Sequence, residues 1–243
     1  MFYDSKKYLF KIISTIIFFV TTFFSCNKKT NAAIGRETGV TIPKKILALG
    51  DSYTIGQSVN EENRFINKTI FILKSSVTNL QYPAQIIAQT GWTIKNLLDG
   101  LLSNTGNITP PYDIVTLLIG VNNQYLHLDT TIYRNEFTMC FQNAITLSGN
   151  RKNRVFVLSA PDYGATPFNS GNAAQIGMEI DRFTAINKQV SLQMGINYTD
   201  ITPSSRMAAT DITLVASDGL HPSGKEYLKW ANMLAPKMLP LLQ

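Results

Sequence analysis

Ser52 stands in the stretch "KILALGDSYTIG", directly after an apolar run. A serine hydroxyl becomes a nucleophile when a neighbouring base removes its proton. Most serines at such positions instead cap a helix or fill a turn, because their side chains bond readily to nearby backbone. The chemistry of Ser52 therefore depends on whether the chain supplies a base, an acid that orients the base, and donors for a developing oxyanion.

Two histidines are candidates for the base. His127 lies in "QYLHLDTT", where Asp129 is the nearby carboxylate, and His221 lies in "SDGLHPSG", three residues after Asp218. The second spacing lets the carboxylate fold back and accept a hydrogen bond from Nδ1, which leaves Nε2 free to take the serine proton. We therefore interpret Ser52, His221 and Asp218 as nucleophile, base and orienting acid. The alternative is that "DGLH" is a turn with an incidental histidine.

Three groups are candidate donors to an oxyanion. The backbone N–H of Ser52 starts the turn after the apolar run, and Gly91 lies in "QTGWT", where a glycine permits close approach of the backbone to a ligand. Asn122, in "IGVNN", offers a side-chain amide. In isolation Gly91 would be a turn glycine and Asn122 a turn or helix-cap residue. Gly120 is interpreted as a backbone device at a strand end, without a chemical role.

The elements that must position these residues follow from the apolar pattern. Short apolar runs predict strands in "KILALG", "AQIIAQT", "YDIVTLLIG", "NRVFVLSAP" and "INYTDI". Helical spacing predicts helices in "NRFINKTIFILKSS", "TIKNLLDGLLSN", "TTIYRNEFTMCFQNAITL" and "AAQIGMEIDRFTAINKQVSLQMG". A last helix is predicted after Ser223, which forms a capping-box pattern with Glu226. Its expected buried face consists of Tyr227, Leu228, Trp230, Ala231 and Leu234.

This alternation predicts an α/β domain with a central parallel sheet covered by helices on both faces. In such sheets, ligands bind outside the carboxyl ends of the strands. Polar clusters follow three of the predicted strands, as Gly50-Asp51-Ser52, "GVNNQ" and "APDYG". The three clusters are therefore expected on one rim, which favours a chemical role for Ser52.

The order of "GDS", an isolated glycine, "GVNN" and "DGLH" resembles the SGNH, or GDSL-type, serine hydrolase family. The segments "APDYGATPF" and "DGLHPSGKEYLKW" resemble its secreted, lipoprotein-like branch. The resemblance implies a flavodoxin-like three-layer α/β/α sandwich. It implies Ser52 as nucleophile and first oxyanion donor, Gly91 and Asn122 as the other donors, and His221 as the base oriented by Asp218. Such a site needs neither a metal nor an organic cofactor.

Two positions depart from the family pattern. Tyr53 follows Ser52 where the namesake motif has leucine, and Asn123 stands where aspartate is usual. Neither position has a catalytic role, so activity is expected to survive. The pattern GxSxG is absent around Ser52, which argues against the strained nucleophile elbow of α/β-hydrolases. Asp51 is expected to be a turn and support residue.

The N-terminus has the pattern of an export signal. Lys6, Lys7 and Lys11 flank an apolar run that is shorter than the about 20 residues of a membrane-spanning helix. The segment "TFFSC" loosely resembles a lipobox that ends at Cys26. We predict a lipoprotein-type signal peptide over 1–25, a tether over 26–42 and the hydrolase domain over 43–243. The protein is then exported and anchored in the bacterial cell envelope through Cys26, with a plain signal peptide or an uncleaved anchor as alternatives.

Composition narrows the remaining function classes. The 243 residues are 44% hydrophobic and 16% charged, which suits one folded domain and not a disordered chain. The net charge of +6 falls by two if the residues before Cys26 are removed, and no basic stripe, zinc spacing or aromatic platform indicates a nucleic-acid partner. Cys140 is expected to be a buried, inert thiol, although a Cys26–Cys140 disulfide stays open in an oxidising compartment. We expect a monomer that meets the membrane only through the lipid anchor.

The main hypothesis is a serine esterase that cleaves carboxylic esters through an acyl-enzyme. One alternative is a carbohydrate O-acetyl esterase of the same fold, and another is a surface-tethered binding protein without catalysis. The substrate is expected to be a small ester or an acylated glycan. Trp92, Tyr125 and Tyr163 either stack on a sugar, wall an acyl pocket or belong to the core. Asp162 and Thr166 are further candidates for the rim, without assigned chemistry.

Overall fold

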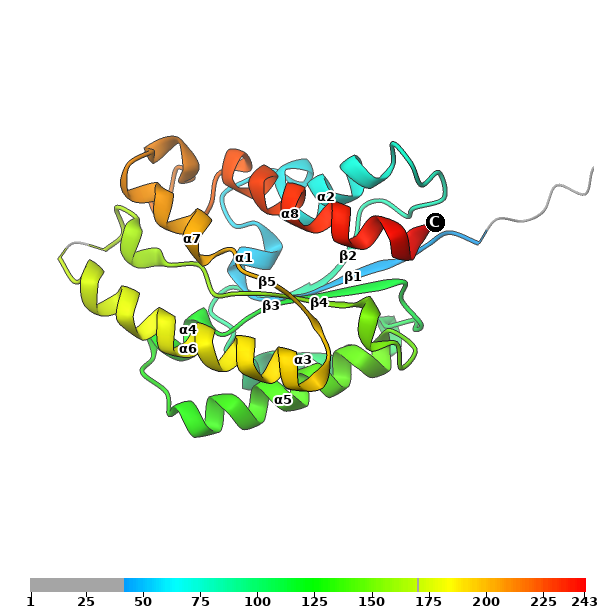
Figure 1. The fold of residues 1–243 in the computed structure, drawn as a ribbon, viewed down its shortest axis with the longest axis horizontal. Coiled ribbons are helices and arrows are strands. Elements are labelled where there is room, and N and C mark those ends of the chain that lie inside the picture. The colour runs from blue at the N-terminus through cyan, green and yellow to red at the C-terminus, as the bar shows by residue number, and fades with distance from the viewer. Residues whose placement is uncertain (1–41, 170) are drawn as a thin grey trace, which may run out of the picture. The chain divides into compact units, whose positions relative to one another are not determined.

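The computed structural model describes residues 42–169 and 171–243, so the predicted signal peptide and all of the predicted tether before residue 42, including Cys26, lie outside the described residues. Within the described part, one parallel sheet has the strand order β2-β1-β3-β4-β5 (Figure 1). The strands are β1 (Ile46–Gly50), β2 (Gln85–Ala88), β3 (Ile114–Leu118), β4 (Val155–Leu158) and β5 (Asn197–Thr199). This order is that of flavodoxin-like folds, which confirms the predicted class.

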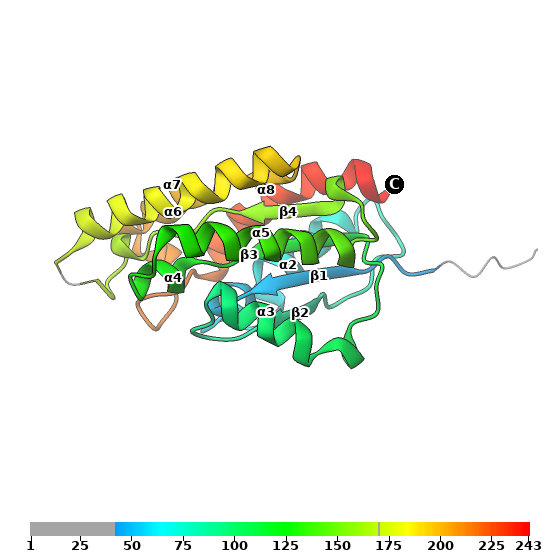
Figure 2. The ribbon, with the colours of Figure 1, turned by 90° about the horizontal axis from the view of Figure 1, so that it is seen from below.

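Helices cover both faces of the sheet (Figures 1 and 2). The longer helices are α2 (Phe65–Leu73), α3 (Ile94–Ser103), α5 (Thr130–Leu147), α6 (Ala173–Met194) and α8 (Gly224–Leu242). Helices α2 and α8 pack against one face, and α3, α5 and α6 pack against the other. The result is a three-layer α/β/α sandwich. The short helices are α1 (Ser52–Ile55), α4 (Val121–Tyr125) and α7 (Thr202–Ser205), and each follows the carboxyl end of a strand.

The apolar strands are buried on both faces, as parallel strands between two helix layers must be. In β1, Ile46 and Ala48 join the core under α2 and α8, while Leu47 and Leu49 join the core under α3, α5 and α6. Alternate residues of a strand point to opposite faces, so a single continuous apolar run supplies both cores. The strand end is thereby held rigidly, and the polar residues that follow it start from a fixed position.

Helix α8 departs from its predicted start in one respect. The Ser223 hydroxyl accepts from the backbone N–H groups of Lys225 and Glu226, but the reciprocal half of the capping box is not formed. The Ser223 N–H donates to the Leu214 carbonyl, and the Glu226 carboxylate turns inward to accept from Trp230 Nε1 at 2.6 Å. The Trp230 indole N–H is buried and would otherwise lack an acceptor, whereas the Ser223 N–H already has one. The Glu226 carboxylate therefore binds the indole.

The structure also bears on the predictions for the buried face of α8, for Cys140 and for Gly120. The predicted buried face of α8 is correct except at Leu228, which is 42% exposed. Within the described part of the chain, Cys140 is a buried free thiol, and burial raises its pKa. Gly120 has a φ of 116°, and a Cβ there would lie 2.8 Å from the Tyr133 ring, so its role is conformational as predicted. None of the helices in the described ranges combines the length and the hydrophobicity of a membrane-spanning segment.

Candidate active site

Ser52 is the first residue of α1, directly after β1. The Asp51 side chain caps this helix by accepting from the Tyr53 N–H at 3.0 Å. The N–H of a residue in the first helical turn has no partner within its helix, so the Ser52 N–H is available to a ligand. The Ser52 hydroxyl is buried but makes no hydrogen bond to another described residue. The β1–α1 turn thus presents one hydroxyl and one N–H at the carboxyl end of the sheet.

The loop before α8 holds Asp218 and His221 together. His221 Nδ1 lies 2.6 Å from Asp218 Oδ2, while Oδ1 accepts from the backbone N–H groups of Leu220 and His221 at 2.9 Å each. Partial burial raises the pKa of Asp218, but these bonds and one from Ser58 outweigh it and hold the pKa well below its ordinary value. The carboxylate is therefore ionised at neutral pH. An ionised Asp218 favours a proton on Nδ1 and leaves Nε2 as an acceptor.

Asn122 lies on α4, directly after β3. Its Nδ2 donates to the Trp92 carbonyl at 3.0 Å and lies 3.5 Å from Asp51 Oδ2. An amide nitrogen carries two hydrogens, so the short bond fixes the side chain, and the second hydrogen makes only a long bond to Asp51 that a nearer acceptor can replace. The neighbouring Asn123 accepts from the Ile94 N–H at 3.0 Å, which ties α4 to the start of α3.

One pocket brings three of the predicted residues together. Ser52, Asn122 and His221 line a cavity of about 170 Å³. Its other walls are Tyr53, Val121, Tyr125, Tyr163, Phe168 and Leu220. Residues from the ends of β1, β3 and β4 therefore share one rim, as predicted. No hydrogen bond joins Ser52 to His221 within the described residues, and catalytic hydrogen bonds commonly tighten only when substrate binds.

Gly91 has a different position from the other predicted donors. It is exposed, has a φ of 78° and would meet nothing within 4 Å if it carried a Cβ. It does not line the pocket of Ser52, but its neighbour Trp92 accepts the hydrogen bond from Asn122. The Trp92 ring itself packs against Gly100 of α3 and, partly buried, against the core, and it does not line the pocket of Ser52.

Tyr53 and Ser58 are functional candidates that sequence reasoning missed. The Tyr53 ring lies 5.0 Å from the His221 ring, between centroids, and burial raises the pKa of its phenol so that it stays neutral. The Ser58 hydroxyl donates to Asp218 Oδ2 at 2.6 Å. Tyr53 was visible only as a departure from the family motif. Ser58 carried no sequence signal, because its contact with Asp218 spans 160 positions.

His127 does not pair with Asp129, the nearby carboxylate in the sequence. Asp129 caps α5 by accepting from the N–H groups of Thr131 and Ile132. His127 Nδ1 instead lies 3.3 Å from Glu179 on α6. Of the two histidines, both of which lie within the described residues, only His221 shares a pocket with Ser52.

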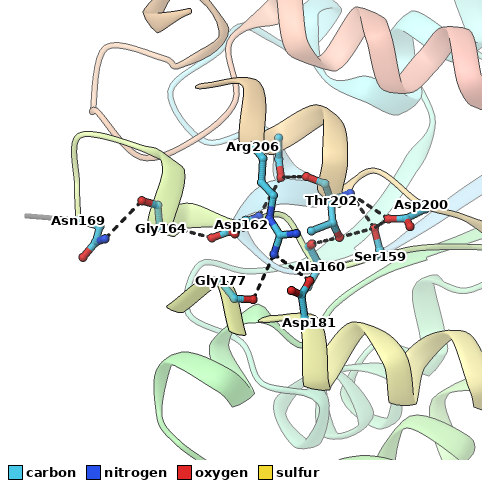
Figure 3. Close-up of polar contacts among 11 residues, drawn as sticks. Ser159, Ala160, Asp162, Gly164, Asn169, Gly177, Asp181, Asp200, Thr202 and Arg206 are labelled. Atoms are coloured by element: carbon cyan, nitrogen blue, oxygen red, sulfur yellow. Dashed lines mark hydrogen bonds and ion pairs between the residues drawn. The ribbon is translucent and has the colours of Figure 1, made fainter. Parts of the chain in front are cut away.

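The "APDYG" segment after β4 is fixed by an ion-pair network (Figure 3). Arg206 donates to the buried Asp162 at 2.8 Å and to Asp181 on α6 at 2.8 Å. Asp162 also accepts from the Gly164 N–H, and the Thr166 hydroxyl donates to the Tyr163 carbonyl at 2.7 Å. Asp162 and Thr166 therefore hold the turn that carries Tyr163, and only Tyr163 reaches the pocket of Ser52.

The carboxyl group of Asp51, next to Ser52 in the sequence, is almost completely buried. Burial raises its pKa to about 7, against the lowering effect of the Tyr53 N–H. Burial therefore favours the neutral form of this carboxyl group, which lies 3.5 Å from the Asn122 amide nitrogen. Within the described residues, no group of three or more His, Cys, Asp or Glu side chains could hold a metal ion.

Solved structures with this fold include several ester hydrolases. The lipase/acylhydrolase from Enterococcus faecalis has a TM-score of 0.64 at 17% identity, covering 82% of this chain and 97% of that chain. An acetyl xylan esterase from Geobacillus stearothermophilus has a TM-score of 0.57 at 16% identity, covering 81% of this chain and 96% of that one. The esterase EstA from a Pseudoalteromonas species has a TM-score of 0.59 at 14% identity, covering 82% and 98%. Such low identities establish the fold alone.

No curated protein matches the chain significantly. The model of the GDSL-like lipase/acylhydrolase family matches residues 48–227, which is well over half of the chain. The matched region starts in β1, before Ser52, and ends in α8, after His221. The chain therefore belongs to the GDSL-like lipase/acylhydrolase family and is, by that membership, a carboxylic ester hydrolase.

Proposed function

We propose that the protein is a serine esterase in which Ser52 is the nucleophile, His221 the general base and Asp218 the residue that orients it. One observation carries the proposal: Ser52 and His221 line a single pocket, and the His221 ring is held by Asp218 at 2.6 Å. Asn122 lines the same pocket, and its second amide hydrogen makes only the 3.5 Å bond to Asp51, which an oxyanion would replace.

The reaction then proceeds in two halves. His221 Nε2 takes the Ser52 proton as Oγ attacks the ester carbonyl carbon, and the carbonyl oxygen becomes an oxyanion. The Ser52 N–H, the Asn122 amide and the Gly91 N–H stabilise this oxyanion, each donor being worth about a hundred- to a thousand-fold in rate. The intermediate collapses, the alcohol leaves with the proton from His221, and an acyl group stays on Ser52. Water then loses a proton to His221 and attacks the acyl carbonyl. The bond from the acyl carbon to Ser52 Oγ breaks, the acid leaves, and His221 returns the proton to Oγ.

Asp218 has a supporting part in both halves. Its carboxylate keeps the Nδ1 proton in place and stabilises the imidazolium that forms when Nε2 is protonated. Because hydrogen bonds hold its pKa low, it stays ionised throughout the pH range in which the histidine can act as a base. Gly91, the third proposed donor, does not line the pocket of Ser52.

Hydrolysis of p-nitrophenyl acetate by purified full-length wild type, Ser52→Ala and His221→Ala tests the proposal. We expect turnover by the wild type, and loss of more than about a thousand-fold in either variant with unchanged circular dichroism. Full activity of Ser52→Ala would contradict the nucleophile assignment. A folded wild type without turnover on any ester would favour the non-catalytic binding protein.

We also propose that the protein is exported and anchored in the cell envelope by a lipid on Cys26, which lies outside the described residues. Support comes from the basic, apolar and small-residue pattern that precedes this cysteine. Metabolic labelling with a palmitate analogue tests it. Label on the wild type that disappears in Cys26→Ser is expected, and equal labelling of both would contradict the anchor.

A further inference from the structure

A second cavity adjoins the pocket of Ser52. It has a volume of about 270 Å³ and shares Tyr125, Tyr163 and Phe168 with that pocket. The three rings stand edge to face, with centroids 5.9 Å apart for Tyr125–Tyr163 and 6.4 Å apart for Tyr163–Phe168. The two cavities are therefore neighbouring compartments of one cleft, with a common aromatic wall. Tyr125 and Phe168 are half exposed, so their ring surfaces are accessible to a ligand.

Polar side chains line the far side of the second cavity. They are His127, Asn169, Asn172, Gln175 and Glu179. None of them belongs to the motifs that identify the catalytic residues. The Asn172 side chain makes no hydrogen bond to another described residue, and that of Gln175 contacts only Glu179. Both residues line the cavity, and their remaining donors and acceptors have no partner among the described residues.

Glu179 is the fixed centre of this polar wall. Its Oε1 accepts from Gln175 at 2.9 Å, and its Oε2 accepts from Gln124 at 2.7 Å and lies 3.3 Å from His127 Nδ1. The bonds from Gln175 and Gln124 lower the pKa of Glu179. The carboxylate is therefore ionised and oriented, and Oε1, which accepts only from Gln175 among the described residues, retains a lone pair for a further donor.

The polar lining of the second cavity indicates which part of a substrate could occupy it when the ester group lies at Ser52. An acyl chain would desolvate the carboxylate and the amides without replacing their hydrogen bonds, which is unfavourable. A phosphate would be repelled by Glu179. A neutral ring with several hydroxyl groups would satisfy the polar wall with its hydroxyls and lay its C–H face on Tyr125 or Phe168.

We propose that the second cavity binds the sugar ring of an acylated carbohydrate, whose ester carbonyl lies at Ser52. The sugar is the alcohol part of the ester and leaves from this cavity after the acyl-enzyme forms. This inference rests on the proposed esterase function and names its substrate class. Gln175, Glu179 and Asn172 then determine specificity without taking part in the chemistry at the ester.

The test compares two acetate esters that differ only in their alcohol, 6-O-acetylglucose and p-nitrophenyl acetate. Full-length wild type, Gln175→Leu and Asn172→Ala are compared by kcat/KM, which reports the steps up to acylation. The matched control is Gln193→Leu, an exposed glutamine on the same helix α6 that lies about 27 Å further along it. We expect Gln175→Leu to lose about tenfold on the sugar ester, as for one or two hydrogen bonds, and less than about twofold on p-nitrophenyl acetate.

The control should lose less than about twofold on either ester, and Asn172→Ala should follow Gln175→Leu with a smaller effect. Equal losses on both esters, or no loss on either, would overturn the sugar site. A gain by Gln175→Leu on p-nitrophenyl octanoate would also overturn it, because the cavity would then hold the acyl chain. A wild type that hydrolyses p-nitrophenyl acetate but not the sugar ester overturns this inference alone. A folded wild type that hydrolyses no ester overturns the proposed function itself.

Discussion

The Ser58 hydroxyl donates to Asp218 Oδ2 at 2.6 Å, and this oxygen also lies 2.6 Å from His221 Nδ1. The residue in the loop after α1 thereby holds the carboxylate that orients the base. Ser58 has a φ of 67°, a conformation that glycine adopts more easily than serine. The serine is therefore present for its hydroxyl and at some conformational cost.

Replacing Ser58 should lower catalysis through Asp218. We expect Ser58→Gly and Ser58→Ala to lower kcat on p-nitrophenyl acetate by about three- to tenfold with little change in KM, as for one hydrogen bond to a charged group. Both variants lose the hydrogen bond to Asp218, but only glycine also relieves the strain of the positive φ. Comparing the two variants therefore separates the effect of the hydroxyl from that of the backbone. Wild-type kcat in both variants would show that His221 and the backbone bonds hold Asp218 without help.

Tyr53 should support the imidazolium of His221. Its ring packs 5.0 Å from the His221 ring, where leucine occupies the family motif. An aromatic face favours a neighbouring cation, so we expect Tyr53→Phe to keep the wild-type kcat and Tyr53→Leu to lose about three- to tenfold. Steady-state kinetics at saturating ester measures both. If Tyr53→Leu matched Tyr53→Phe, the ring would be only a packing element.

Asp51 should make the stability of the fold depend on pH. Burial raises its pKa from 3.8 to about 7, so the folded state binds this proton more tightly than the unfolded chain does. Its contribution to stability is therefore complete below about pH 4 and is lost as the pH rises toward 7. Asp51→Asn keeps the cap to the Tyr53 N–H and should remove this dependence, which is at most about 1.4 kcal/mol per pH unit.

Urea unfolding of wild type and Asp51→Asn between pH 4 and pH 7 measures the effect. The free energy of unfolding of the variant should improve relative to wild type as the pH rises. Parallel pH profiles would mean that Asp51 has the same proton affinity in both states, contrary to its burial.

Arg206 should stabilise the turn that carries Tyr163. Its side chain is 38% exposed, while that of its partner Asp162 is only 5% exposed, so Arg206→Met leaves a buried carboxylate unpaired (Figure 3). We expect a loss of about 2–3 kcal/mol in the free energy of unfolding, below the range of a fully buried pair. The exposed pair Lys225–Asp211 provides the control, and Lys225→Met should cost less than about 1 kcal/mol.

A double variant separates charge from packing in this network. Adding Asp162→Asn to Arg206→Met removes the unpaired charge and should recover part of the lost stability. A double variant that is less stable by the sum of both single losses would show that the two residues act independently.

Much of the fold was predictable because its long elements have clear periodicity. Helix α5 occupies the predicted segment Thr130–Leu147, and the buried runs became the five strands. The short helices α1, α4 and α7 were not predicted, since four or five residues are too few to display a helical period. The predicted capping box at Ser223 is half formed, because the indole of Trp230 competes for Glu226.

The candidate site was predictable only where its residues lie in short motifs. Ser52, Asn122 and the Asp218–His221 pair follow strands or share one loop, so their sequence neighbours mark them. The contacts Ser58–Asp218 and His127–Glu179 join distant segments, and no local pattern indicates either one. For Gly91 the reverse holds. The family resemblance indicates it as a site residue, but it does not line the pocket of Ser52.

Mapping a covalent adduct tests the central claim most directly. A fluorophosphonate reacts with an activated serine, and peptide mass spectrometry locates the modified residue. We predict one adduct per chain on the peptide that contains Ser52, no adduct in Ser52→Ala, and strongly slowed labelling in His221→Ala. Labelling of a different serine, or unchanged labelling of Ser52→Ala, would contradict the assignment of Ser52 as the nucleophile.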